Sequence, residues 1–246
     1  MQLRDHFVAS GHWLFRRRSW LPLIPFVLVI LGLWGYEYPG DSRSLHRAWG
    51  VLCLGVGMFG VVIRALTIGY IAGGTSGRNR AEQVADTLNT RGVYSVVRHP
   101  LYVGNYFMWL GVTLLPRDPW IPLVVTLVFW LYYERIMAAE EDFLRGKFGR
   151  AFEEWATRTP AFIPALGQWE SEDRSFSFKM ILRREHSGVF GLIVTICVLA
   201  AVGDMIAAGE LRVDPFWAWI LGVSTVVLGL VVATKRYTGL LDMTDR

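Results

Sequence analysis

The sequence of 246 residues carries little charge for its length. Charged residues make up 19% of the chain, hydrophobic residues 53%, and the mean hydropathy is +0.35. An ordinary soluble domain has about 25% charged residues, so this chain is too apolar for one. The low charge therefore excludes a typical soluble globular protein and points to a membrane.

Cysteine is almost absent, and histidine lacks metal-binding patterns. Cys53 and Cys197 both lie inside apolar runs without metal-type spacing, so we predict packed thiols and infer no redox compartment from them. The five histidines form neither the H-x-x-x-H nor the H-E-x-x-H pattern that holds zinc or iron. The sequence predicts no metal cofactor.

Two glycine-rich stretches imitate nucleotide-binding motifs without their context. Gly55, Gly57 and Gly60 have G-x-G-x-x-G spacing but lie within an apolar run. A dinucleotide site needs a strand before the glycines, so we interpret them as helix-packing residues. Residues 73–78, GGTSGR, could hold an anion with backbone N–H groups, but no Gly-Lys-Ser/Thr follows them. A serine hydrolase has no local support either, because the sequence contains no G-x-S-x-G.

Long apolar runs are abundant. A helix of about 20 apolar residues crosses the ~30 Å hydrocarbon core of a bilayer. We predict an all-α bundle of about six transmembrane helices that forms one integral membrane domain over residues 1–246. The first run has no A-x-A-like cleavage site, so we treat it as a retained helix and not as a signal peptide. The predicted spans are 20–35, 48–71, 101–115, 120–137, 189–207 and 216–233.

Lys and Arg are divided unevenly between the two sets of connections. With the N-terminus in the cytoplasm, the outer connections hold only Arg43, Arg47, Arg117 and Arg212 of the 25 basic residues. Cytoplasmic connections are enriched in Lys and Arg, so we predict that both termini are cytoplasmic. The net charge of +4 and the pI near 9.2 fit a protein that lies against anionic headgroups and do not require a nucleic acid.

Two polar segments, 73–100 and 134–186, are long enough to build a site, and this topology places both in the cytoplasm, where they can meet. In the first segment, Arg98 and His99 precede Pro100, which disfavours helix before it and suits the first turn of a helix. The pair should lie at the mouth of the next span, where free N–H groups and the helix dipole attract a carboxylate or phosphate. Alternatively, each nearby arginine is only a positive-inside anchor.

The second polar segment begins with carboxylates. Glu140 and Glu141 come at the cytoplasmic end of a predicted span, and acids near a membrane need a partner. After them, aromatic residues recur at helical spacing beside basic ones. This pattern predicts an amphipathic helix on the membrane surface that ends at Thr159-Pro160. Such a helix could also do no more than cover the bundle.

These motifs resemble those of the isoprenylcysteine carboxyl methyltransferases and their phospholipid methyltransferase relatives. Two motifs occur in order, separated by a predicted transmembrane hairpin, and the likeness covers residues 64–164. It is carried by Gly92-x-Tyr94-x-x-x-Arg98-His99-Pro100-x-Tyr102-x-Gly104, Glu134-Arg135-Ile136, Glu140-Glu141, Phe148-Gly149 and Pro160-x-Phe162-Ile163-Pro164.

The resemblance implies a membrane enzyme that transfers a methyl group from S-adenosylmethionine (SAM) to a membrane lipid or lipidated substrate entering from the bilayer. Residues 64–164 would form the methyltransferase core, and residues 185–236 an additional C-terminal transmembrane hairpin outside the shared region. The implied cofactor-binding residues are Tyr94, His99, Pro100, Tyr102, Gly104, Asn105, Glu140 and Glu141.

The many arginines suit an anionic acceptor. A sulfonium methyl group needs only a nucleophile in line behind it, so positioning and desolvation can supply most of the acceleration. Arginine can then hold the acceptor as a bidentate clamp. We expect Arg64 and Arg98 to be catalytic together with Glu141. The expected acceptor-binding residues are Arg16, Arg17, Arg64, Arg78 and Arg91.

Several interpretations of the acceptor and of the protein class stay open. HWLFRRRSWLPL, GGTSGRN and LNTRGVYS resemble the bacterial branch that methylates the phosphate of lipid A, which would place the chain in an inner membrane. The triple arginine is also a common topology signal, and the isoprenylcysteine carboxylate is the alternative acceptor. Membrane sterol reductases share a similar Arg-His-x-x-Tyr-x-Gly segment but bind a nicotinamide cofactor. A non-enzymatic scaffold or transporter would bind neither cofactor.

Overall fold

The structure is a computed structural model that describes residues 3–18, 20–21, 24–71 and 85–241, and within these it contains helices and no β-strand. Arg78, Arg80 and the glycine-rich loop at 73–77 lie outside the described residues. The elements are α1 (Leu3–Arg17), α2 (Phe26–Leu31), η2 (Pro39–Asp41), α3 (Arg43–Tyr70), α4 (Val93–Val96), α5 (Pro100–Thr113), α6 (Trp120–Phe148), α7 (Arg150–Arg158), η3 (Leu166–Gln168), α8 (Phe178–Ala208) and α9 (Pro215–Tyr237).

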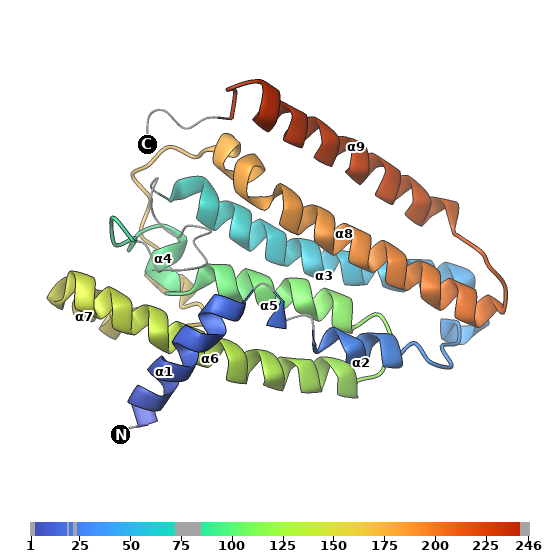
Figure 1. Ribbon diagram of the computed structural model, residues 1–246, viewed down its shortest axis with the longest axis horizontal. Coiled ribbons are helices and arrows are strands. Elements are labelled where there is room, and N and C mark those ends of the chain that lie inside the picture. Colours follow the sequence, from blue (N-terminus) through green and yellow to red (C-terminus); the bar gives the residue numbers. More distant parts are fainter. Residues whose placement is uncertain (1–2, 19, 22–23, 72–84, 242–246) are drawn as a thin grey trace.

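The long helices run side by side along one axis, and the connections gather at its two ends (Figure 1). One end, here called the motif end, holds α1, α4, α7 and the chain that links α7 to α8. The opposite end holds η2 and the connections α5–α6 and α8–α9. The two polar segments predicted to meet therefore lie at the same end of the bundle.

In the part of the chain that the structure describes, four helices are long and apolar enough to cross a membrane. They are α3, α6, α8 and α9, with 28, 29, 31 and 23 residues. At 1.5 Å per residue the shortest measures about 35 Å, which exceeds the ~30 Å of a hydrocarbon core. The chain is an integral membrane protein with an all-helical fold in its described part.

Two of the six predicted spans are not full transmembrane helices, so that prediction is wrong. Among its described residues, the run at 20–35 contains one α-helix, the six-residue α2, which begins after Pro25 and ends at Leu31, before Gly32. The span predicted at 101–115 is α5, and its 14 residues cover only about 21 Å. Hydropathy counts apolar residues, but it does not register where proline and glycine begin or end a helix.

Glycines allow α3 and α5 to pack backbone against backbone. A Cβ atom on Gly111 would lie 2.7 Å from the Gly57 nitrogen, and one on Gly60 would clash with the Gly104 carbonyl oxygen. The interpretation of Gly57 and Gly60 as helix-packing residues is confirmed. Gly55 has nothing within 4 Å of its Cβ position and takes no part in this contact.

An arginine–carboxylate pair joins α3 to α8 at each end of their contact. Arg43 Nε donates to Asp204 Oδ1 at 2.9 Å, and Arg64 Nε donates to Glu185 Oε2 at 2.6 Å. Both carboxylates are buried, Asp204 to 0% and Glu185 to 3% exposure. A charge inside a bilayer is stable only when it is paired. These two pairs therefore fix the register of α8 against α3.

The predicted amphipathic helix is split in two. Gly149 adopts a φ of +53°, a conformation that glycine adopts readily, and it interrupts the helix between α6 and α7. Helix α7 buries Phe152 and Trp155 against the rest of the protein and ends at Arg158, before the predicted stop at Thr159-Pro160. The helix therefore covers the motif end of the bundle.

Candidate functional site

The two sequence motifs are joined directly through their backbones. The N–H of Arg98 donates to the Pro160 carbonyl at 2.9 Å, and the N–H of His99 donates to the Ala161 carbonyl at 3.1 Å. Pro100 occupies the first turn of α5, as predicted, so His99 stands just outside the helix. The prediction that the two polar segments meet is confirmed.

Five side chains from these motifs form one hydrogen-bonded group, here called the carboxylate–histidine cluster: Arg98, His99, Tyr102, Glu140 and Glu141. The His99 ring lies between the two carboxylates, with Nδ1 3.5 Å from Glu140 Oε2 and Nε2 3.1 Å from Glu141 Oε1. Tyr102 donates its hydroxyl to Glu140 Oε1 at 2.6 Å, and Arg98 Nε donates to Glu141 Oε1 at 2.8 Å. The N-terminus of α5 is thereby tied to the end of α6.

His99 is positioned to carry a positive charge. Its exposure is only 7%, and this burial on its own lowers the pKa of the imidazole. Hydrogen bonds to Glu140 and Glu141 and their negative charges outweigh burial and raise the pKa of His99 above its ordinary value of 6.5. A neutral imidazole can donate to one carboxylate only, whereas the imidazolium donates to both.

The raised pKa of His99 predicts a pH-dependent stability. The group contributes fully below about pH 6.5, and its contribution is lost as pH rises through the pKa of the folded protein. The free energy of unfolding should therefore fall over this window by at most about 1.4 kcal/mol per pH unit. Thermal unfolding in detergent between about pH 6 and 9 should show this fall in wild type but not in His99→Gln. Parallel curves for the two proteins would contradict it.

Arg98 is bound on several sides by the protein itself. Besides Glu141, its guanidinium donates to the carbonyls of Ala156, at 2.9 Å, and Thr159. These carbonyls lie at the C-terminal end of α7, where unpaired carbonyls attract cations. The arrangement joins α5, α6 and α7 around one cation, which favours a positioning role for Arg98 over the predicted clamp on the acceptor.

Arg64 lies in a second polar group, here called the arginine network: Arg64, Glu185, Asn105 and Tyr133. Arg64 donates to both carboxylate oxygens of Glu185, at 2.6 and 2.7 Å, and Nη1 donates to Asn105 Oδ1 at 2.6 Å. Asn105 in turn donates to the Tyr133 hydroxyl at 3.1 Å. Gly104 lies against the stem of Arg64, and a Cβ there would clash with Arg64 Cγ.

The cluster and the network adjoin through aromatic rings. The centroids of Tyr102 and Tyr133 are 4.6 Å apart, and the His99 ring stacks on Tyr102 at 5.7 Å with an interplanar angle of 19°. Tyr133 belongs to an apolar core with Phe129 and Ile136, whose exposures are 1% and 0%. The rings of Tyr102 and Tyr133, here called the aromatic wall, therefore lie between the charged carboxylate–histidine cluster and the paired Arg64.

Comparison with known proteins identifies the family to which the chain belongs. A family model described as phospholipid methyltransferase matches residues 45–151. The cobalt-zinc-cadmium resistance protein CzcN of Cupriavidus metallidurans is 34% identical over 67% of this chain and 71% of its own length.

The chain belongs to the phospholipid and isoprenylcysteine methyltransferase family. The nickel-cobalt-cadmium resistance protein NccN of Alcaligenes xylosoxydans xylosoxydans is 35% identical over 62% of this chain and 66% of its own length. The "Probable protein-S-isoprenylcysteine O-methyltransferase" of Oryza sativa subsp. indica is 32% identical over 50% of this chain and 66% of its own length. No solved structure matches the chain significantly. Membership in a family of SAM-dependent membrane methyltransferases confirms the resemblance seen in the motifs.

The remaining predicted cofactor residues, Pro100 and Tyr94, make structural contacts beside the cluster. Pro100 is buried at the start of α5. The Tyr94 ring packs with Ile68, Ile71 and Met180, and its carbonyl accepts a hydrogen bond from Trp155 Nε1 at 3.1 Å. These contacts place the Tyr94 side chain among α3 and α8 residues.

The N-terminal arginines lie close to the family motifs because α1 crosses α6. Arg17 stacks on Trp13, with its Cζ 4.0 Å from the ring centroid, and Arg16 is exposed. The Arg18 Cζ lies 3.8 Å from the centroid of the Phe15 ring.

Arg91 is placed differently from the other predicted acceptor-binding residues. It pairs with Asp173, an exposed carboxylate of the chain before α8. Of the predicted acceptor-binding residues, the structure therefore links Arg64 through Asn105 to the Tyr133 ring and binds Arg91 elsewhere.

Sequence reasoning missed Glu185 and Tyr133, which complete the arginine network. Glu185 lies in α8, outside the residues that match the family model. Glu185 follows Arg183 and Arg184 in the charged first turns of α8, so its local sequence offers basic neighbours and gives no signal toward Arg64. The sequence alone does not say which arginine is its partner. Tyr133 carries no signal either, since tyrosine is common in apolar helices near a membrane surface.

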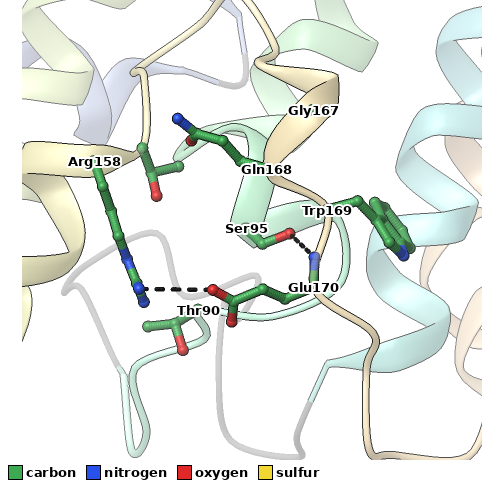
Figure 2. Close-up of a pocket in the computed structure, with 8 residues that line it drawn as sticks. Thr90, Ser95, Arg158, Gly167, Gln168, Trp169 and Glu170 are labelled. Carbon is green, nitrogen blue, oxygen red and sulfur yellow. Dashed lines mark hydrogen bonds and ion pairs between the residues drawn. The ribbon is translucent and has the colours of Figure 1, made fainter.

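A cavity of about 410 Å³ lies at the motif end, beside α4 and the chain after α7. Figure 2 shows Arg158 and Glu170 reaching toward each other across it, with 3.6 Å between Arg158 Nη1 and Glu170 Oε1. The Ser95 hydroxyl accepts a hydrogen bond from the Glu170 N–H at 2.9 Å. Thr159 also lines the cavity, and its carbonyl binds Arg98. The cavity thus adjoins the carboxylate–histidine cluster. Its lining residues are Thr90, Ser95, Arg158, Thr159, Gly167, Gln168, Trp169 and Glu170.

Proposed function

We propose that this chain is a SAM-dependent O-methyltransferase that acts on an anionic oxygen of a lipophilic acceptor at the motif end of the bundle. The observation that carries this proposal is that both family motifs converge in one cluster, where His99, Arg98 and Tyr102 share the carboxylates of Glu140 and Glu141. The positive-inside distribution of Lys and Arg supports a cytoplasmic site, and an inner membrane is the membrane we propose.

The residues present fit the cofactor. SAM, when bound, supplies an activated methyl group on a sulfonium cation. The carboxylates of Glu140 and Glu141 and the ring faces of Tyr102 and Tyr133 suit a cation. The neighbouring cavity of about 410 Å³ has the size of a small-molecule site and a polar lining. We assign cofactor binding to this cluster together with the cavity.

We propose a carboxylate as the acceptor group, as in an S-isoprenylated cysteine. The rice relative is named for that substrate, whereas the metal-resistance relatives are not named for a reaction. The lipid A phosphate predicted from the N-terminal arginines gains no support from these names. Arg17 and Arg18, moreover, are stacked on Trp13 and Phe15.

The residues of the chain then bind the acceptor, orient it toward the methyl group and exclude water from the site. An oxyanion acceptor is already a nucleophile, so the site needs no strong general base and works by positioning. Arg64, whose charge is balanced by Glu185, offers guanidinium N–H groups beside the rings of Tyr102 and Tyr133, where they can donate to the acceptor anion. Phe129, Tyr133 and Ile136 form the apolar face beside it and keep water out.

Arg64→Ala should abolish transfer while SAM binding stays within about twofold of wild type. Loss of one fixed donor for the reacting anion should lower turnover by about 100-fold or more. Calorimetry with SAM measures binding. Turnover with labelled SAM should be measured on N-acetyl-S-farnesylcysteine and on total membrane lipid, with mass spectrometry of the labelled product.

Arg150→Ala is the matched control for Arg64→Ala, because Arg150 is a fully surface-directed arginine of α7 with 89% side-chain exposure. It should leave both quantities unchanged. Normal turnover of Arg64→Ala would remove Arg64 from the site. Binding of NADPH but not of SAM by wild type would favour the reductase interpretation, and binding of neither would favour a scaffold or transporter.

A second candidate function is a role in metal-ion resistance, because CzcN and NccN are 34% and 35% identical to this chain. Among the described residues, no group of three or more His, Cys, Asp or Glu side chains could hold a metal ion. Growth of a cobalt-sensitive bacterial host that expresses wild type or His99→Ala tests this role. Equal protection by both proteins would separate resistance from methyl transfer.

A further inference from the structure

We infer that the C-terminal hairpin of α8 and α9 is part of the active site, because Glu185 of α8 positions Arg64 for the acceptor. This inference rests on the proposed methyl transfer and extends it to a residue outside the matched region 45–151. Glu185 lies 121 residues beyond Arg64 in the chain and outside the predicted core 64–164. The core would therefore be incomplete without the hairpin.

Glu185 holds Arg64 along one whole edge of the guanidinium. Arg64 Nε and Nη2 donate to the two carboxylate oxygens at 2.6 and 2.7 Å. The carboxylate is 3% exposed and the arginine side chain 20% exposed, so the pair is shielded from water. A bidentate pair of this kind fixes the plane of the guanidinium as well as its position.

The fixed edge determines where the rest of Arg64 points. With Nε and Nη2 bound to Glu185, Nη1 is directed to Asn105 Oδ1 at 2.6 Å, within the helix that carries the Arg-His-Pro motif. Asn105 then donates to Tyr133, whose ring lies against Tyr102. Glu185 thus connects α8 through Arg64 to the aromatic wall beside the carboxylate–histidine cluster.

Without the Glu185 charge, Arg64 would no longer be held in this place. An unpaired cation in an apolar bundle is costly, and a long arginine side chain can turn toward the headgroups instead. Gly104 lies against the Arg64 stem, so this movement would also loosen the start of α5. The expected defect is in the placement of the acceptor anion, with little effect on SAM.

Asp204 provides a matched comparison on the same helix. It pairs with Arg43 of α3 through two hydrogen bonds, as Glu185 pairs with Arg64, and it is 0% exposed. Its other partner is the Tyr38 hydroxyl at 2.7 Å, and all three residues lie at the end opposite the motifs. Asp204 therefore serves stability without touching the proposed site.

Glu185→Gln and Asp204→Asn, which keep the shape and remove the charge, test the inference. Both should lower the melting temperature in detergent. Glu185→Gln alone should lower kcat by tenfold or more and raise the acceptor KM, with an unchanged SAM Kd. Asp204→Asn should keep the kcat and KM of wild type. Wild-type kcat and KM for Glu185→Gln would overturn the inference. A wild-type protein that neither binds SAM nor methylates any acceptor would instead overturn the proposed function.

The exchanged pair Arg64→Glu with Glu185→Arg separates positioning from stability. It restores the ion pair between α3 and α8 but moves the guanidinium away from Asn105. We expect the melting temperature to recover relative to Glu185→Gln while turnover does not. Recovery of both would show that the pair is only structural and would overturn the positioning role.

Discussion

Replacing Glu141 with alanine should destabilise the protein by about 3 kcal/mol and weaken SAM binding by at least about tenfold. One oxygen, Oε1, accepts hydrogen bonds from both Arg98 and His99, at 2.8 and 3.1 Å. The side chains of Arg98 and His99 are 15% and 6% exposed, so water cannot fully replace the carboxylate. Two cations would then face each other at the start of α5. Thermal unfolding in detergent and calorimetry with SAM measure the two effects.

Glu154→Ala is the control for Glu141→Ala, because Glu154 is an exposed glutamate of α7 whose one ion pair among the described residues is with the surface residue Arg150. Exposed pairs of this kind contribute little, so both measurements should match wild type. Wild-type SAM affinity in Glu141→Ala would show that the carboxylate–histidine cluster does not hold the cofactor.

Gly60→Ala should remove most activity and lower the free energy of unfolding by about 3 kcal/mol. The added Cβ would clash with the Gly104 carbonyl oxygen and lie 2.9 Å from the Met108 nitrogen. Both atoms belong to the backbone of α5, so α5 as a whole must move away from α3. Arg64 follows Gly60 by one helical turn on the same face of α3, and its contact with Asn105 would be lost. Melting temperature and turnover on the same preparation measure the change.

Gly55→Ala is the matched control for Gly60→Ala. The two glycines belong to the same apolar helix, but nothing lies within 4 Å of the Gly55 Cβ position. Alanine stabilises a helix interior by about 0.5–1 kcal/mol relative to glycine. Gly55→Ala should therefore be as active as wild type and at least as stable. Equal losses in the two variants would argue against a steric cause.

The contact between the two motifs could be predicted because the local sequence of each motif indicates its place relative to a helix. Pro100 places His99 at a helix start, and Glu140 with Glu141 falls at the end of a long apolar helix. Helices α5 and α6 run antiparallel between the motifs, so the chain returns to the end of the bundle from which it started and brings the motifs together there. The pairing of His99 with both glutamates follows from charge once that end is shared.

Lateral packing could not be predicted in the same way. Arg64 pairs with Glu185 because α8 packs against α3. No local sequence pattern predicts which helices pack against each other. The number of spans was overestimated because α2 and α5 are apolar but short. The segment with the N-terminal arginines suggested a lipid A phosphate as acceptor, yet Arg17 and Arg18 lie on the aromatic rings of Trp13 and Phe15 in α1.

The ion pairs Arg43–Asp204 and Arg64–Glu185 of α3 indicate how deeply the protein is placed in a membrane. Between Arg43 and Arg64 the helix rises about 32 Å, close to the ~30 Å between the two hydrocarbon boundaries of a membrane. In a much thicker bilayer one of the two ion pairs would lie inside the hydrocarbon core, and in a much thinner one apolar side chains of α3 would be exposed to water. Arg64 would therefore lie near one hydrocarbon boundary, where the acceptor that we propose would keep its lipid tail in the bilayer and present its carboxylate to the site.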